Sequence, residues 1–432
     1  MTTTRRPRLP SLAVAVLVLS AGATQAARAQ NGERAARTDL SFLASDRLEG
    51  RFTGSARADS AASYLAKRFG EVGAKPGVPG WLQRFAIAPD LVALRELPAE
   101  QRPAAATNVI AVVRGRDRVL REEVVVVGAH YDHLGLGQTS SLSLGSRGEI
   151  HNGADDNASG TVALLEIARR LASRPAKRTV VLVAFSGEEL GLLGSAAYVK
   201  APALPMAKTV AMINLDMVGR LRNDRLLAFG SETAVEFPAL LDSLNREARF
   251  DLKYSGDGYG RSDQQSFYVA GKPVIHFFTD LHEDYHRPSD DAEKVNVAGL
   301  VRVAAFATEL TRAVADRAAP LTFVNKPPPA APVASGNPAA TPGYGAYLGS
   351  IPDMSVGGPG VRISGVRPES PAAKAGLVEG DVLLGIGAFE IGDLQAMTDA
   401  LRQHRPGDTA TVRFRRGAVV DSVRVVFGRR GG

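Results

Sequence analysis

The stretch HEDYH at residues 282–286 has the spacing H-E-x-x-H, in which a helix presents two histidines and a glutamate base to one zinc ion. That chemistry needs a helix of several turns. The preceding run PVIHFF is apolar and β-branched, as strands are, and Pro288 follows closely, so little helix is available. The sequence therefore argues against a single zinc ion held on a helix. We expect His286 to be one ligand among several, and His282 and Glu283 to be loop or rim residues.

Histidine and acidic residues gather in five segments of the chain, most of them directly after an apolar run. These residues are His130, Asp132 and His133, then Asp155 and Asp156, then Glu188 and Glu189, then Asp216, and finally His282, Glu283 and His286. Each segment alone has an ordinary explanation, such as a surface pair, a helix N-cap or solvated charges at a helix start. Five such segments together are poorly explained by capping and solubility, and they predict one shared site.

The residue types at this site favour metal chemistry. Imidazole and carboxylate ligands fit zinc, with manganese or cobalt as substitutes. The chain has no cysteine, which excludes thiolate ligands and disulfides. Crowded carboxylates repel one another unless cations neutralise them. Two ions about 3.5–4 Å apart that share one carboxylate would do so, and they would activate a water molecule near neutral pH.

The apolar runs predict strands that are buried on both faces. They span residues 108–113, 123–130, 179–187, 210–219 and 273–278. Apolar residues at helical spacing predict helices within 160–173, 234–248 and 291–316, and a helical lead-in within 31–85 that stops at Gly73. This alternation predicts an α/β fold, a three-layer α/β/α sandwich around a mostly parallel mixed sheet. Sites in such sheets form at the carboxyl ends of the strands, where the polar segments stand.

The two ends of the chain differ from this middle part. Residues 1–29 carry arginines, an apolar run of about twelve residues and small residues at Ala27–Ala29, which predicts a signal peptide and an exported, periplasmic or extracellular protein. The run is shorter than the roughly 20 residues of a spanning helix, so we expect no membrane span after cleavage. Without the four leader arginines the formal charge falls from +7 to +3, and no nucleic-acid partner is indicated. Residues 320–342 are rich in Pro and Ala and predict a linker.

Six blocks of the sequence resemble, in the correct order, the di-zinc aminopeptidases of peptidase family twenty-eight, specifically the exported bacterial members with a C-terminal PDZ domain. The blocks are GAHYDHLG, HNGADDNASG, FSGEELGLLGS, INLDMVG, RSDQQSF and LHEDYHRPSDD. The resemblance covers roughly residues 38–316. It implies a zinc-exopeptidase fold in residues 30–319, two Zn²⁺ ions, and the N-termini of peptides or proteins as substrates.

The family pattern, carried over block by block, assigns the metal ligands. It makes His130 and Asp216 ligands of one metal, Glu189 and His286 ligands of the other, and Asp156 the bridging carboxylate. No ligand position is lost, which argues against a non-catalytic relative.

The same pattern assigns three further roles. Glu188 matches the general base, Tyr285 a residue that steadies the oxyanion, and Asp132 the group that orients His130. Asp155 stands where the family varies.

Residues 343–432 resemble a PDZ domain, through the segment VRPESPAAKAGLVEGDVLLGIG. Such domains bind the C-terminal end of a peptide by β-augmentation. Tyr347, Leu348 and Gly349 match the turn that captures the carboxylate, and a helix from Asp393 would form the other wall of the groove. A packing or tethering domain without a ligand is the alternative.

The complete ligand set favours an exported metallo-aminopeptidase. A glutaminyl cyclase uses the same fold with one zinc ion. A carboxypeptidase or dipeptidase would need a positive group for the substrate carboxylate, a role for which Arg261 is available. A non-catalytic binding protein that acts through the PDZ domain would leave the metal-binding residues without a purpose.

Overall fold

The computed structural model describes most of the chain. The described residues are 30–89, 91–94, 97–143, 146–260, 262–326, 346–352, 360–367, 369–392, 396–397, 400–401 and 403–428. The predicted signal peptide, Arg261, Asp393 and most of the predicted linker lie outside them. Within the described residues, no helix combines the length and hydrophobicity needed to cross a membrane.

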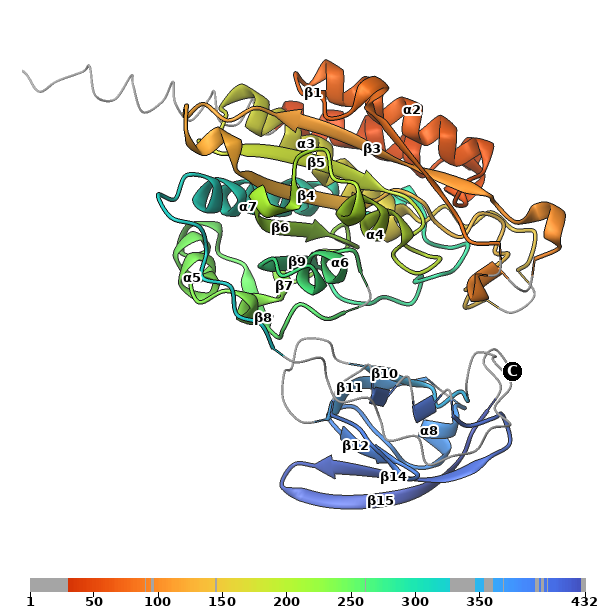
Figure 1. Ribbon diagram of the computed structural model, residues 1–432. Helices are drawn as coiled ribbons and strands as arrows, with labels where there is room; N and C mark the ends of the chain where they lie inside the picture. The colour runs from red at the N-terminus through yellow and green to blue at the C-terminus, as the bar shows by residue number, and fades with distance from the viewer. Residues whose placement is uncertain are drawn as a thin grey trace, which may run out of the picture.

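Four parallel strands form the centre of a nine-stranded sheet with the order β1-β3-β5-β4-β6-β9-β7-β8, in which β2 also pairs with β3 (Figure 1). These central strands are β5 (Thr179–Phe185), β4 (Val124–His130), β6 (Thr209–Leu215) and β9 (Val274–Phe278). Every residue of β4, β5 and β9 is buried, which is why their sequences are almost continuously apolar. The predicted central strands are therefore confirmed.

The strands on the two flanks of the sheet pair antiparallel with the central strands and were only partly predicted. On one side lie β3 (Ala105–Val113), β1 (Lys75–Pro76) and β2 (Leu82–Ala86). On the other side lie β7 (Arg225–Phe229), which is antiparallel to β9, and β8 (Asp251–Ser255). The lead-in helix α2 (Ala56–Glu71) ends close to the predicted stop at Gly73, but the strands β1 and β2 that follow it were not predicted. β2 alternates between intermediate and exposed residues and lacks the apolar run that marks a central strand.

Helices cover both faces of the sheet, as the sandwich prediction requires. Alternate residues of β4 show this: Val125 and Val127 pack in the cluster that contains α2 (Ala56–Glu71), α3 (Gly160–Ser173), α5 (Phe237–Ala248) and α7 (Val297–Ala315). Val124 and Val126 pack in a second cluster with α4 (Leu193–Lys200) and α6 (Gln264–Val269). A further helix spans 30–43 and joins the first cluster. The three-layer α/β/α fold is confirmed.

The C-terminal part has a separate sheet and core. Its antiparallel strands are β10 (Ser350–Pro352), β11 (Val361–Val366), β12 (Val382–Ile386), β13 (Phe389–Glu390), β14 (Thr409–Arg416) and β15 (Val419–Val426). The short helix α8 (Pro371–Lys374) and helical residues at 396–397 and 400–401 accompany them. Buried residues from these elements, such as Ile363, Leu383 and Phe414, form one cluster. This small β-rich domain agrees with the predicted fold class.

Candidate metal centre

The five predicted ligands meet at one edge of the central sheet. His130 is the last residue of β4, Asp216 directly follows β6, and Glu189 follows β5. Asp156 lies in the short irregular segment Ala154–Ser159 that leads into α3, and its own backbone is not helical. His286 comes from the turns after β9, and no helix forms over 282–286, which confirms the rejection of the helical H-E-x-x-H site.

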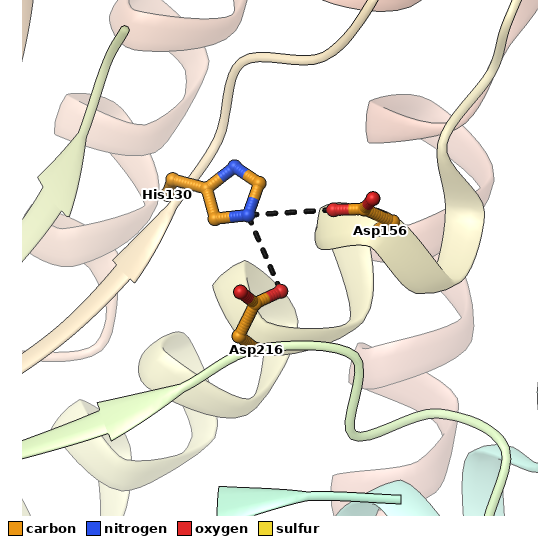
Figure 2. Close-up of side chains that lie close together, drawn as sticks. All are labelled: His130, Asp156 and Asp216. Carbon is orange, nitrogen blue, oxygen red and sulfur yellow. Dashed lines mark hydrogen bonds and ion pairs between the residues drawn. The ribbon is translucent and has the colours of Figure 1, made fainter. Parts of the chain in front are cut away.

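The first group of ligand atoms surrounds His130, whose side chain is 1% exposed. Its Nε2 lies 3.2 Å from Asp216 Oδ1 and 3.4 Å from Asp156 Oδ1 (Figure 2). Its Nδ1 donates a hydrogen bond to the backbone oxygen of Asp132 at 3.1 Å. Because a carbonyl can only accept, this bond places the proton on Nδ1 and leaves the Nε2 lone pair facing the two carboxylates. The group is suited to bind a cation.

The second group repeats this arrangement around His286. Its Nε2 lies 3.2 Å from both Asp156 Oδ2 and Glu189 Oε2, and its Nδ1 donates to the backbone oxygen of Ser140 at 3.0 Å. Asp156 therefore turns one carboxylate oxygen toward each histidine. Burial raises the pKa of this carboxyl group, but the neighbouring imidazoles of His130 and His286 outweigh burial and hold it well below its usual range.

His133 is a site residue to which the sequence assigned no role. It is fully buried. Its Nδ1 lies 2.8 Å from Glu189 Oε1 and 3.9 Å from Asp156 Oδ2, so this nitrogen is close enough to bind a metal ion together with these two carboxylates. Its Nε2 is buried and finds no partner among the described residues. The second ring nitrogen of His286 has a carbonyl acceptor, whereas that of His133 has none among the described residues, so the geometry favours His286 as the candidate ligand. The sequence signal for this residue was the second histidine of the segment HYDH at residues 130–133.

Glu188 and Tyr285 face the same space. Glu188 Oε2 lies 4.0 Å from His130 Nε2, and its side chain is 10% exposed, which rules out a solvated helix-start charge. Burial raises the pKa of Glu188 well above its ordinary value; His130 opposes this rise, and repulsion from Glu189 and Asp216 adds to it. The Tyr285 ring stacks on His286 at a centroid distance of 3.9 Å.

Asp132 lies next to the His130 ring, but its carboxylate is not the acceptor nearest to the His130 Nδ1. The His130 Nδ1 is 3.8 Å from Asp132 Oδ1, farther than from the backbone oxygen of the same residue. The carboxylate instead accepts from Thr53 Oγ1 at 2.6 Å and from the backbone N–H of Glu188 at 3.4 Å. Asp132 thus links the segment of the first ligand to the backbone of Glu188.

Asp155 and His282 form a buried pair beside the site. His282 Nε2 donates to Asp155 Oδ2 at 3.0 Å, while Asp155 Oδ1 accepts from the Gly219 backbone at 2.7 Å. His282 is therefore a buried loop residue, since only 3% of its side chain is exposed, and Asp155 is not a helix N-cap.

Asp290 braces the segment that carries Asp156. Its Oδ2 accepts hydrogen bonds from the backbone N–H groups of Asp155 and Asp156 at 2.9 and 3.0 Å. Its Oδ1 accepts from Arg220 at 2.9 Å, and Arg220 also contacts Asp284 at 3.1 Å. The loop after β9 is thus tied to the bridging carboxylate by charge-assisted bonds.

The donor set fits divalent metal ions. Within the described residues, two groups of possible ligands are found, and in each of them the ligand atoms lie within 4.8 Å of one another. One group contains His130 and Asp216, the other contains His133 and Glu189, and both include Asp156. All donors are imidazole nitrogens or carboxylate oxygens, which zinc accepts. Burial of several carboxylates without a cation would be costly.

The three predicted PDZ residues lie at the start of the C-terminal sheet. Tyr347 exchanges backbone hydrogen bonds with Gly428, and the backbone oxygens of Leu348 and Gly349 accept from Ala372 and Arg367. Gly349 has φ +84°, and a Cβ there would come within 2.2 Å of the Ser370 Cβ. The turn therefore needs glycine.

Comparison with known proteins agrees with the two-part organisation. Residues 108–311 match the sequence profile described as Peptidase family M28, and residues 331–426 match that of the PDZ domain. The match to the M28 family thus extends over slightly less than half of this chain. A probable leucine aminopeptidase of Arthroderma otae is 30% identical over 219 residues, covering 47% of this chain and 57% of the relative. Aminopeptidase YwaD of Bacillus subtilis is 29% identical over 199 residues, covering 44% and 40%. The chain thus spans only about half the length of these relatives.

Solved structures share the fold of the α/β/α domain. A zinc aminopeptidase from Bacillus subtilis superposes with a TM-score of 0.52 and 19% identity, covering 68% of this chain and 96% of that one. A glutaminyl cyclase from Bacteroides thetaiotaomicron gives a TM-score of 0.51 and 18% identity, covering 65% and 97%. Because both enzymes share the fold, the fold does not decide between their activities.

Proposed function

We propose that this protein is an exported aminopeptidase that uses two divalent metal ions, with zinc as the expected metal. The observation that carries the proposal is the bridging position of Asp156, whose two oxygens face His130 and His286 at 3.4 and 3.2 Å. Each histidine has a second carboxylate beside it, Asp216 or Glu189, so each side of Asp156 offers a three-residue ligand set. A one-metal site would not need the second set.

The ligands would be His130, Asp156 and Asp216 for one ion, and His286, Asp156 and Glu189 for the other. Bound ions would acidify a water molecule and polarise the scissile carbonyl group.

The side chains of the protein would then move the proton and bear the charge. Glu188, held by the Asp132 carboxylate through its backbone, accepts the proton of the attacking water and later gives it to the leaving amine. Tyr285 donates a hydrogen bond to the oxyanion from its position over His286.

Substitution of the base tests this mechanism. Glu188→Gln is close in shape but accepts no proton, so we expect the zinc content of the wild type and a turnover of leucine anilide reduced about 10²–10⁴-fold. Glu247→Gln, an exposed glutamate in α5, is the matched control and should keep full activity. Substantial turnover by Glu188→Gln at normal zinc content would contradict the assignment.

One substrate set separates the competing activities. An aminopeptidase releases the first residue of a free peptide and leaves the N-acetylated peptide intact, whereas a carboxypeptidase ignores N-acetylation. A glutaminyl cyclase converts an N-terminal glutamine without shortening the chain. Mass spectrometry of the products distinguishes these outcomes, and a wild type that cyclises but does not cleave would favour the one-zinc alternative.

We further propose that the C-terminal domain binds C-terminal peptide ends at Tyr347, Leu348 and Gly349. The turn lies beside β10, at one edge of its sheet, where an added strand could pair. Fluorescence anisotropy with a peptide library, in free-acid and amidated forms, tests this. Equal binding of both forms, or no binding at all, would favour a tethering role.

A further inference from the structure

Arg51 lies under the candidate metal centre and is entirely buried. Its guanidinium donates to four backbone oxygens: to Tyr131 at 2.7 Å, to Asn152 at 2.7 Å, to Gly153 at 3.0 Å, and to Leu43. Arginine seldom occupies the interior of a protein, because loss of hydration penalises its charge. Here backbone dipoles replace the water.

The four oxygens belong to three separate parts of the chain. Tyr131 lies between His130 and Asp132, and residues 152–153 lie just before Asp156. Leu43 ends the helix 30–43. One side chain therefore ties the segment of the first ligand and the segment of the bridging carboxylate to the same support.

The backbone around Arg51 joins the same segments. The backbone oxygen of Arg51 accepts from His133 N at 3.3 Å, Phe52 forms a parallel bridge with His133, and Thr53 Oγ1 donates to Asp132. Arg51 itself has φ +49°, in the left-handed region that costs energy for a side chain larger than glycine. The surrounding contacts hold it there.

The charge of Arg51 is also placed to act on the ligands. Among the described residues, no carboxylate lies within ion-pair distance of it. Burial lowers its pKa to about 10, against the attraction of Asp132, Asp156 and Glu189, so it stays cationic at neutral pH. A fixed positive charge below the site reduces the repulsion among the carboxylates above it.

We propose that Arg51 is a positioning residue for metal binding, which fixes the distance between the His130 and Asp156 segments. It lies outside residues 108–311, the part that matches the M28 family, so the segment before that match would complete the centre. The inference rests on the proposed metal site but does not require peptidase activity.

Zinc binding by the full chain tests the proposal. Zinc content is measured by elemental analysis and affinity by competition with a chelator, for the wild type, Arg51→Met, Arg51→Lys and Arg47→Met. Arg47 is an exposed arginine of the same segment and serves as the control. We expect Arg51→Met to weaken zinc binding about 10- to 100-fold, as lost support of ligands does elsewhere. Arg51→Lys should lie in between, because an ammonium keeps the charge but has three donors.

Several results would overturn the inference. One is wild-type zinc affinity in a folded Arg51→Met chain. If that variant does not fold, Arg51→Lys decides alone, and wild-type affinity in it would show that the four contacts are dispensable. A wild type that binds zinc but cleaves no peptide would refute the proposed function and leave this test intact.

Discussion

Replacement of Asp290 by asparagine should weaken the centre without touching a ligand. The carboxylate accepts two backbone N–H groups on one oxygen and Arg220 on the other. The asparagine amide has one oxygen. If this oxygen faces the backbone, the amide N–H₂ faces the Arg220 donor, and the reverse orientation opposes the backbone donors.

The free energy of unfolding should fall by about 2–4 kcal/mol. Charge-assisted hydrogen bonds contribute about 1.5–3 kcal/mol each, and breaking a buried ion pair costs about 3–5 kcal/mol. We expect less than the full cost of a broken ion pair for two reasons. Arg220 keeps its contact with Asp284 at 3.1 Å, and the amide oxygen of asparagine still accepts hydrogen bonds from one of the two sets of donors. At about 2–4 °C per kcal/mol for a large domain, the melting temperature of the α/β/α domain should drop by about 4–16 °C.

Differential scanning calorimetry with and without zinc measures this effect. We also expect weaker zinc binding, since the backbone amide of the bridging Asp156 loses its anionic acceptor. Glu293→Gln, an exposed neighbour, is the control and should melt as the wild type does. Unchanged melting and zinc affinity in Asp290→Asn would refute the view that Asp290 braces the bridge.

Three further predictions follow from other contacts. Thr53→Val removes the 2.6 Å hydrogen bond to Asp132 and should lower kcat/KM about tenfold at normal zinc content, as steady-state kinetics would show; unchanged kinetics would mean that Asp132 needs no support. Removal of metal with a chelator should lower the melting temperature reversibly, because the clustered carboxylates then repel one another, and identical melts would argue against a metal centre. Burial opposes ionisation of Asp381, but Arg416 outweighs it and lowers the pKa of this carboxyl group. The stability it gives the C-terminal domain is present above the unfolded value of about 3.9 and is lost as pH falls through the lower folded value, which acid unfolding followed by circular dichroism would detect.

The sequence predicted the central sheet because burial on both faces leaves a mark on every residue of a strand. β4, β5 and β9 are buried throughout, so their apolar runs were unambiguous. The short outer strands β1, β2, β7 and β8 lack this mark. β8, for example, has only exposed and intermediate residues and no apolar run.

The candidate ligands were predictable for a related reason. His130 ends β4 and Asp216 directly follows β6. Because sites in parallel sheets form at the carboxyl ends of the strands, the sequence alone is enough to expect these two residues close together. The position of the strand ends does not decide between His133 and His286 as the ligand. That choice depends on the acceptor at the second ring nitrogen, Ser140 O for His286 and none for His133 among the described residues.

The supporting residues escaped sequence analysis because most of them act on the backbone. Arg51 donates to carbonyl oxygens and Asp290 accepts from amide N–H groups, and every residue other than proline offers such partners. The types of the side chains therefore do not indicate which residues form these contacts. The pair of His282 with Asp155 differs, because there both partners are side chains of complementary type. The ligand pattern can consequently stay intact while the support is lost. A chain that keeps all five ligand residues but has methionine in place of Arg51 should look complete by its motifs and still bind zinc poorly.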